Sequence, residues 1–477
     1  MAVYCQELMW ETGYGGLLND VGYGMCPVAD NGVVLAGSTF SFGAGDYDTY
    51  VLRLDSLGDT LWSVTWGGSS SDHAYDIVSS ADDGFVVVGS TQSFGNGGRD
   101  VCLFKVSGTG HVMWTRSFGG TSDDIGNSVR CLPDSGFIIA GTTSSSGAGY
   151  DDILLIRTDK NGLVRWQRTY GGTGGETGMA VRTVAGINPG YIVVGSTGSF
   201  GDGYSSIYAI RTDTLGDTIW TATYGGSRAD IGQAVEAAAD GGFLIAGATA
   251  SYGSGFYDCY VARTDADGVL LWQNWYGGAK DDRCYAVAAT PDHGWILAGT
   301  SESSGAGKID ILLTRITDDG DPVWSRTIGG TESDYARAVV PTADGNTLAA
   351  GYSYSYSYGG SDVYVVKIRG DAMTAVFEQS SSGLPAAAAL EQNYPNPFNA
   401  STTITFDLTS QSAVELAIFN ILGHTVRQFT QSLLPAGRYR VEWDGTDDHG
   451  RPVASGVYLY RLSTGSASLS KKMVLVK

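Results

Sequence analysis

Positive charge is scarce in this sequence. Lysine and arginine number 29 against 50 aspartates and glutamates, which leaves a formal net charge of −21. A surface this acidic repels phosphate backbones and anionic lipid headgroups, so nucleic acid is excluded as an expected partner. No run of 18 apolar residues occurs, so no transmembrane segment is predicted. The opening MAVYCQELMW also lacks the basic and apolar regions of a signal peptide.

Cysteine and histidine are too few and too scattered for the common metal and nucleophilic sites. The cysteines show no C-x-x-C spacing, which argues against zinc, and their density does not indicate a disulfide scaffold. Neither G-x-S-x-G nor the phosphate-binding G-x-x-x-x-G-K-[ST] occurs. The six cysteines are Cys5, Cys26, Cys102, Cys131, Cys259 and Cys284.

Glycine, in contrast, is abundant, with 69 residues against 11 prolines. Together with many Tyr, Thr and Val residues, this composition is typical of short strands separated by turns, and it predicts an all-β protein. Tryptophan marks an internal repeat of seven units, and pairs of glycines keep the same rhythm. The intervals are 52 residues, except for one of 54, between Trp10, Trp62, Trp114, Trp166, Trp220, Trp272 and Trp324.

Turn residues divide each repeat into four apolar or alternating runs, as in DHAYDIVSSADDG, FVVVGSTQSFGNGGRD, VCLFKVSGTG and HVMWTRSFGG. Four-stranded units in radial array predict a seven-bladed β-propeller over residues 1–370. The chain opens with a tryptophan strand, and the last unit, which ends at Arg369, lacks one. We therefore expect the N-terminal strand to complete the last blade and to close the ring.

An acidic residue opens the innermost strand of every repeat. Seven carboxylates at one rim of a central channel could bind calcium, because hard cations take several oxygen ligands. They could equally accept N–H groups from the preceding Gly-Gly turn, a bond that every repeat would need. Both interpretations stay open, and calcium is the candidate cofactor. The seven residues are Asp20, Asp72, Asp124, Glu176, Asp230, Asp282 and Asp334.

Residues that differ between repeats are better candidates for a single functional site than residues that every repeat shares. The loops between the second and third strands differ in aromatic and charged residues, and they fall on the same face as the acidic rim. This face is predicted to bind sugar rings or peptides, so a polysaccharide or a surface protein is the expected partner. The candidate binding residues are Asp72, His73, Arg99, Asp124, Glu176, Arg228, Asp230, Tyr257, Asp282 and Asp334.

The repeat resembles the propeller repeats of large secreted bacterial proteins, through phrases such as DGGFLIAGATASYGSGFYDCYVARTDADG. After Arg369 this pattern stops. Residues 371–392 are rich in small residues and serine, which is typical of a linker. Residues 393–477 form short alternating runs such as TTITFDL and GVYLYRLSTG, and about seven strands in such a length predict an immunoglobulin-like β-sandwich.

The second domain resembles the C-terminal sorting domains of type IX secretion cargo, through NYPNPFNASTTITF, VELAIFNILGHTVRQF, LPAGRYRVEWDGTDDHGRPVASGVYLYRL and the terminal KKMVLVK. Ala400 is a departure, because that family commonly has proline there. The resemblance implies the type IX secretion machinery as a partner, and a secreted or cell-surface protein that reaches the periplasm by means of a signal peptide, so the lack of one suggests a truncated reading frame or a mature form. The motif residues are Tyr394, Pro395, Asn396, Pro397, Phe398, Gly423, Trp443, Asp444, Gly456, Tyr458 and Lys472.

Two functions follow from these predictions. The first is a secreted or surface-displayed propeller that acts as a binding or adhesion module. The alternative is an extracellular polysaccharide hydrolase or lyase that uses acidic residues of the same loop face. Carboxylate pairs arise by chance among 50 acids, so no catalytic residue is assigned and binding is preferred to catalysis.

Overall fold

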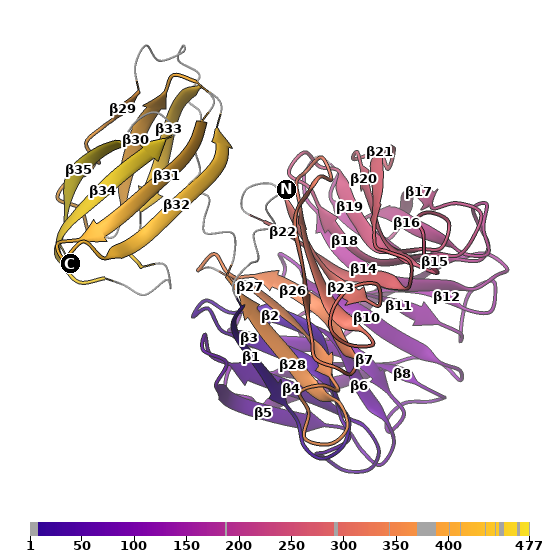
Figure 1. The fold of residues 1–477 in the computed structure, drawn as a ribbon. Coiled ribbons are helices and arrows are strands. Elements are labelled where there is room, and N and C mark those ends of the chain that lie inside the picture. The colour runs from indigo at the N-terminus through magenta and orange to yellow at the C-terminus, as the bar shows by residue number, and fades with distance from the viewer. Residues whose placement is uncertain are drawn as a thin grey trace. The chain divides into compact units, whose positions relative to one another are not determined.

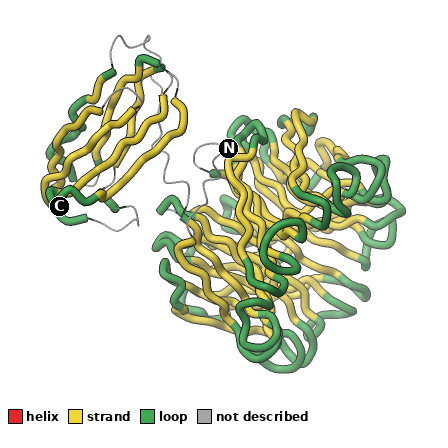
Figure 2. Tube along the Cα trace, in the orientation of Figure 1, coloured by secondary structure: helices red, strands yellow, loops and turns green. Residues whose placement is uncertain are grey.

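The computed structural model describes residues 8–186, 188–290, 294–342, 344–369, 388–399, 401–410, 412–434, 436–443, 445–447, 453–464 and 468–476. These residues form strands, turns and loops, and none of them is helical (Figure 2). Within the same ranges there is accordingly no helix long and apolar enough to cross a membrane. The chain divides into two compact units, with the boundary between Ile368 and Arg369.

The first unit is a seven-bladed β-propeller (Figure 1). Each blade is a sheet of four antiparallel strands, as the repeat predicts. Six blades follow the chain from the innermost to the outermost strand: β2 (Asp20–Pro27), β3 (Val33–Thr39), β4 (Asp48–Leu54), β5 (Thr60–Trp66); β6 (Asp72–Ser79), β7 (Phe85–Thr91), β8 (Asp100–Val106), β9 (Val112–Phe118); β10 (Asp124–Cys131), β11 (Phe137–Thr143), β12 (Asp152–Thr158), β13 (Val164–Tyr170); β14 (Glu176–Val184), β15 (Gly190–Thr197), β16 (Ser206–Asp213), β17 (Thr218–Tyr224); β18 (Asp230–Ala237), β19 (Phe243–Thr249), β20 (Asp258–Thr264), β21 (Leu270–Tyr276); β22 (Asp282–Ala289), β23 (Trp295–Ser301), β24 (Asp310–Ile316), β25 (Pro322–Ile328).

The seventh blade joins the two ends of the propeller. It contains β26 (Asp334–Pro341), β27 (Thr347–Ser353) and β28 (Asp362–Ile368), and its outermost strand is β1 (Leu8–Tyr14). β1 pairs antiparallel with β28, and Figure 1 shows the two strands side by side. The prediction that the N-terminal strand closes the ring is confirmed. Because of this pairing, no blade is left with three strands where the ends meet.

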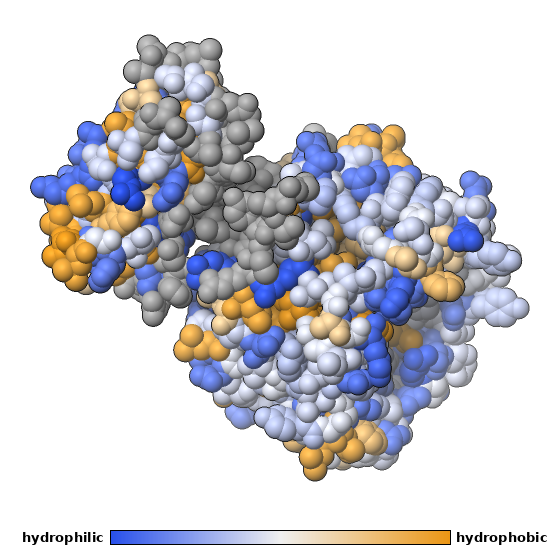
Figure 3. Space-filling view, in the orientation of Figure 1, coloured by the Kyte–Doolittle hydropathy of each residue, from blue (hydrophilic) through white to orange (hydrophobic). Residues whose placement is uncertain are grey.

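The innermost strands form a closed ring around the propeller axis, since each contacts the innermost strands of both neighbouring blades. The second and third strands carry the core, and in the first blade β3 and β4 are buried over their whole length. The outermost strand, β5, is partly exposed. On the face drawn in Figure 3, exposed apolar side chains lie in several separate groups. Scattered exposure of this kind is ordinary for a folded domain.

The repeated tryptophans join each blade to the next. The indole N–H of Trp62 donates to the carbonyl of Gly108 in the following blade, at 3.0 Å. Trp10 donates in the same way to the carbonyl of Ser56, at 3.3 Å, and so spans the junction where the ring closes. The hydroxyl of Tyr14 adds a bond of 2.6 Å to the carbonyl of Gly58. The tryptophan rhythm in the sequence therefore reflects the contact between blades.

The second unit is a β-sandwich. One sheet contains β29 (Ala389–Leu390), β30 (Thr402–Leu408) and β33 (Gly437–Trp443). The other contains β32 (Thr425–Leu434), β31 (Ser412–Asn420), β34 (Gly456–Thr464) and β35 (Ser468–Leu475). A single apolar core lies between the two sheets.

The sandwich begins before the boundary that the sequence predicts at residue 393. β29 lies inside the predicted linker 371–392, and it pairs with β30 through Leu390 and Phe406. Leu390 is 7% exposed and belongs to the core of the sandwich. A strand of two residues is too short to show a period, which explains why the sequence did not indicate it. Residues 371–387 of the predicted linker lie outside the described residues.

Candidate ligand-binding channel

The seven acidic residues that open the innermost strands are buried, with at most 2% exposure. In the second blade, the Asp72 carboxylate accepts the N–H of Gly68 at 2.8 Å and the hydroxyl of Ser93 at 2.6 Å. The backbone N–H of a Gly-Gly turn is bound in the same way by Asp20, Asp124, Glu176, Asp230, Asp282 and Asp334. These are the bonds expected from the second interpretation, in which each carboxylate accepts N–H groups from the Gly-Gly turn that precedes it. Over the described ranges, no three His, Cys, Asp or Glu side chains are grouped as metal ligands.

The charged residues of the predicted loop face are largely engaged with their neighbours. Arg99 forms an ion pair of 2.7 Å with Asp123. The ring of Tyr257 lies 4.2 Å from the guanidinium of Arg283. Arg228 is exposed, and its guanidinium donates to the backbone carbonyl of Ala250 at 3.3 Å.

His73, the remaining candidate from the sequence, lies in an aromatic environment near the axis. Its Nδ1 is 2.9 Å from the hydroxyl of Ser38. Its ring is 5.3 Å from the ring of Tyr47 and is stacked 6.0 Å from that of Tyr75. Burial lowers the pKa of His73, more than Asp72 raises it, so the imidazole is neutral at neutral pH.

Each innermost strand carries a β-bulge at its fourth residue. In the first blade the pairing of β2 with β3 passes from Gly22 to Gly24 and leaves Tyr23 without a partner. The six other blades have the same shift at the same place. A bulge changes the direction of the side chain that it carries, and bulges are common beside functional sites.

A recurrent glycine in the second strand makes the bulge possible. A Cβ atom built on Gly89 would lie 1.8 Å from the carbonyl oxygen of His73, and one built on Gly37 would lie 1.9 Å from that of Val21. No side chain fits at such a distance. The bulged strand therefore approaches its neighbour because this position is glycine.

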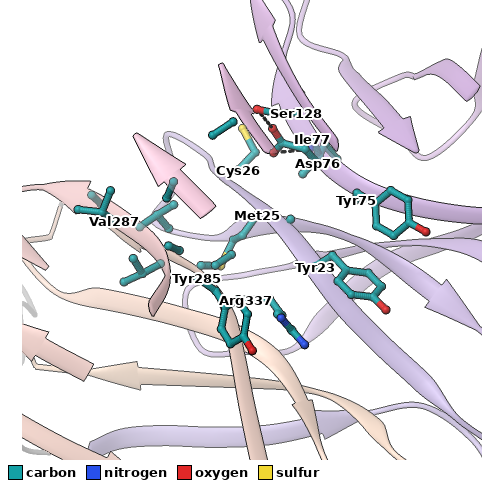
Figure 4. Close-up of a pocket in the computed structure, with 18 of the residues that line it drawn as sticks. Tyr23, Met25, Cys26, Tyr75, Asp76, Ile77, Ser128, Tyr285, Val287 and Arg337 are labelled. Atoms are coloured by element: carbon teal, nitrogen blue, oxygen red, sulfur yellow. Dashed lines mark hydrogen bonds between the residues drawn. The ribbon is translucent and has the colours of Figure 1, made fainter. Parts of the chain in front are cut away.

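The seven bulge residues differ from one another, although the strands and the bulge that present them, which we call the frame, repeat in every blade. With the residues that follow them on the innermost strands, they line a cavity of about 320 Å³ on the propeller axis. Figure 4 shows Tyr285 beside Arg337, with Tyr23 and Tyr75 on neighbouring strands. We call this space the channel cavity. Its bulge residues are Tyr23, Tyr75, Asn127, Met179, Gln233, Tyr285 and Arg337.

Aromatic rings gather on one side of the channel cavity. The rings of Tyr23 and Tyr75 meet edge to face at 5.3 Å. The rings of Tyr335 and Tyr352, which stack at 4.5 Å outside the lining of the cavity, each lie 5.8 Å from the Arg337 guanidinium. That guanidinium lies 3.9 Å from the centre of the Tyr285 ring. Such stacking holds a guanidinium by cation–π attraction.

Three arginines and two acids supply the charge of the channel cavity. Arg130 pairs with Asp76 at 2.7 Å, and Arg182 pairs with Glu236 at 2.9 Å. Among the described residues, Arg337 forms no ion pair. Burial alone would lower the pKa of Arg337, but the neighbouring tyrosines raise it, so the guanidinium is charged. The channel cavity thus holds one uncompensated positive charge in a strongly acidic protein.

The bulge residues were not predicted from the sequence, although His73 nearby was. A signal was present, because the fourth residue of each innermost strand changes from repeat to repeat while the residue before it stays small. The predicted site consisted of the rim acids and of loop residues instead. Unpaired positions in a strand follow from pairing register, which alternation of polar and apolar residues does not reveal.

Most residues of the predicted sorting motif help to build the sandwich. Phe398 is 2% exposed, and its ring lies 5.5 Å from that of Trp443. The ring of Tyr458 meets Trp443 edge to face at 5.3 Å. Asn396 accepts the N–H of Val474 at 2.9 Å. These contacts tie the start of the domain to its core and to its last strand.

The other motif residues lie at turns, at strand ends or on the surface. Gly423 has a φ of +81° between β31 and β32, and Gly456 begins β34. Tyr394 and Lys472 are exposed, and Pro395 and Pro397 follow cis peptide bonds. The described cysteines are free. Three residues discussed above lie outside the described residues: Cys5, Ala400 and Asp444.

Comparison with known proteins supports the sandwich and shows only distant similarity for the propeller. The family model of the FlgD Ig-like domain matches residues 393–468. Among solved structures, the chain is similar to PorZ, a surface component of the type-IX secretion system of Porphyromonas gingivalis, at 13% identity and a TM-score of 0.44. That match covers 97% of this chain and 60% of PorZ, so the chain spans about 60% of the length of PorZ.

Two other similar solved structures are proteins of different kinds. The WD40 domain of Neurospora crassa Pan2 has 11% identity and a TM-score of 0.48, and the match covers 77% of this chain and 97% of that domain. The PQQ-bound aldose sugar dehydrogenase of Streptomyces coelicolor has 11% identity and a TM-score of 0.38, with 76% and 98% covered. No curated protein matches the sequence. The propeller assignment therefore rests on the strand pairing described above.

Proposed function

We propose that this chain is a binding or adhesion module whose ligand is bound in the channel cavity. One observation carries this proposal: the bulge residues vary from blade to blade while the frame that presents them is repeated. A repeated frame needs no such variation for its own stability. Variation that converges on one cavity is what a single asymmetric ligand requires.

The size and lining of the channel cavity support a compact ligand that contains a ring. Its volume of about 320 Å³ is at the lower end of the range for ligand pockets. Tyrosines offer flat faces, and the amides of Asn127 and Gln233 offer polar groups. One residue of a polysaccharide, or one side chain of a surface protein, fits this description. The alternative of a hydrolase or lyase gains no support from the rim acids, because they are buried and bonded to their own turns.

Glycan-array binding by the full chain tests this proposal. Tyr75→Ala and Tyr285→Ala remove rings from the channel cavity and are expected to weaken binding about tenfold or more, as loss of an aromatic contact does. Tyr204→Ala is the matched control, since this tyrosine is 91% exposed on a loop of the face that the sequence predicted to bind. A loss of binding with Tyr204→Ala, and none with the channel variants, would place the site on that loop face.

We further propose that the sandwich is an export domain, which would make the type IX secretion machinery a partner and the protein secreted or displayed on the cell surface via the periplasm. The motif residues and the sandwich fold support this proposal. In a bacterium with type IX secretion, a chain that ends before residue 388 should remain in the periplasm. Tyr204→Ala in the full chain is the control and should be exported. Normal secretion of the shortened chain would refute the export role.

A further inference from the structure

Arg337 is held in place by groups that leave its charge unmatched. Its Nη2 donates to the hydroxyl of Tyr352 at 3.3 Å, and its guanidinium stacks on Tyr285. Its Nε atom is buried and has no hydrogen-bond partner among the residues that the structure describes. Phenols orient a guanidinium but carry no negative charge of their own at neutral pH. An anion on the ligand would supply both the missing charge and the missing acceptor.

The other arginines of the cavity indicate which anion Arg337 binds. A guanidinium presents its N–H groups in a rigid fork that matches two oxygens of a carboxylate or of a phosphate. In this cavity Arg130 and Arg182 are each paired with a carboxylate. A carboxylate is therefore the anion that the cavity favours at Arg337.

We infer that the ligand of the channel cavity is an acidic saccharide, bound through a uronate residue whose carboxylate pairs with Arg337. This inference rests on the proposed function and specifies its ligand. The C–H faces of a sugar ring pack against tyrosines, and its hydroxyls are suited to the amide of Gln233, which lines the cavity. A cavity of about 320 Å³ has room for one sugar residue rather than for a long chain.

A peptide fits this channel less well than a sugar does. Peptides commonly bind by adding a strand to the edge of a sheet, which needs a regular row of N–H and C=O groups. The bulge interrupts that row in the middle of every innermost strand. The channel walls therefore lack the edge on which an extended peptide would pair.

Calorimetric titration of the unaltered full chain gives the first test, with no substitution needed. The probes are oligogalacturonate, its methyl ester, and a neutral oligosaccharide of the same length. Masking the carboxylate as an ester should weaken binding about tenfold to a hundredfold, since a charge-assisted hydrogen bond is lost. Equal affinity for the acid and the ester would overturn the inference, as would binding of a peptide with a free C-terminal carboxylate when no uronate binds.

Substitution of Arg337 gives the second test. Arg337→Met should abolish the preference for the acid over the ester, whereas Arg337→Lys should keep part of it. Arg165→Met, at an exposed arginine on the outermost strand β13, is the control and should bind like the unaltered chain. A neutral glycan could bind in a Tyr75-dependent manner while Arg337→Met leaves the affinity for every uronate unchanged. That result would contradict the inference that the ligand is a uronate, but not the proposed function. Binding that ignores both Tyr75 and Arg337 would contradict the proposed function as well.

Discussion

Asp48 and Asp72 belong to neighbouring blades, yet their carboxylates both lie against the α-carbon of Gly67. A Cβ atom built on Gly67 would be 1.8 Å from Asp48 Oδ1 and 2.7 Å from Asp72 Oδ2, so the two carboxylates are close neighbours. Five other junctions between blades have the same arrangement. The junction before the fifth blade differs, because Ser206 replaces the first acid and Gly225 there adopts a φ of +121°. Buried acids of consecutive blades are thus paired around most of the ring.

Asp48 makes the stability of the propeller sensitive to pH. Burial, and then the Asp72 charge, raise the pKa of Asp48. A raised folded-state pKa favours the protonated carboxyl, so this stabilisation is present at low pH and is lost as the pH rises through that pKa. Asp48→Asn cannot ionise and keeps an acceptor for the Ala44 N–H. The variant is therefore expected to unfold at a higher temperature than the unaltered chain at pH 8, and at nearly the same temperature at pH 4.

Asp30, in the same blade, is a control whose contribution to stability should have the opposite pH dependence. The bond from Arg53 lowers the pKa of Asp30, so the stability that Asp30 provides is present at neutral pH and is lost as the pH falls. Asp30→Asn should therefore lower the unfolding temperature at pH 8. Thermal unfolding followed by circular dichroism between pH 4 and pH 8 checks both variants. Equal destabilisation by Asp48→Asn at every pH would contradict the paired-acid account.

The glycine opposite each bulge should resist substitution. Gly89→Ala places a Cβ atom 1.8 Å from the His73 carbonyl oxygen, so the bulged strand must move. We expect a loss of about 1–3 kcal/mol in the free energy of unfolding, the usual effect of overpacking. Gly175→Ala is the control, because nothing lies within 4 Å of its Cβ position. Urea unfolding measures the free energy of unfolding of both variants. Similar free energies for the two variants would show that the bulge does not depend on Gly89.

Closure of the ring should depend on Trp10. Its side chain is half-buried and bonds to the next blade across the junction. Trp10→Ala is expected to cost about 2–3 kcal/mol, somewhat less than removal of a fully buried tryptophan. Leu61→Ala on β5 is the control, since Leu61 is 56% exposed. If urea unfolding gave equal stabilities for the two variants, β1 would not be essential to the last blade.

The sequence predicted the frame well because the frame is repetitive. Trp10 without a preceding unit, and Arg369 without a following tryptophan strand, were enough to predict the closing strand. The rim acids such as Asp72 left two interpretations, because sequence alone does not show whether a carboxylate faces a channel or its own turn. Arg337 could not be assigned, since its place in the cavity depends on a bulge. Its importance also depends on ion pairs that other arginines form across blades.

Hydrogen–deuterium exchange of the full chain tests the central claim most directly, when it is measured with and without a saturating amount of the tightest-binding glycan. The account predicts slower exchange in the bulged strands β2, β6, β22 and β26, whose side chains line the aromatic side of the channel cavity. Protection confined to the loops at 92–99 and 250–257, with no change in those four strands, would contradict it.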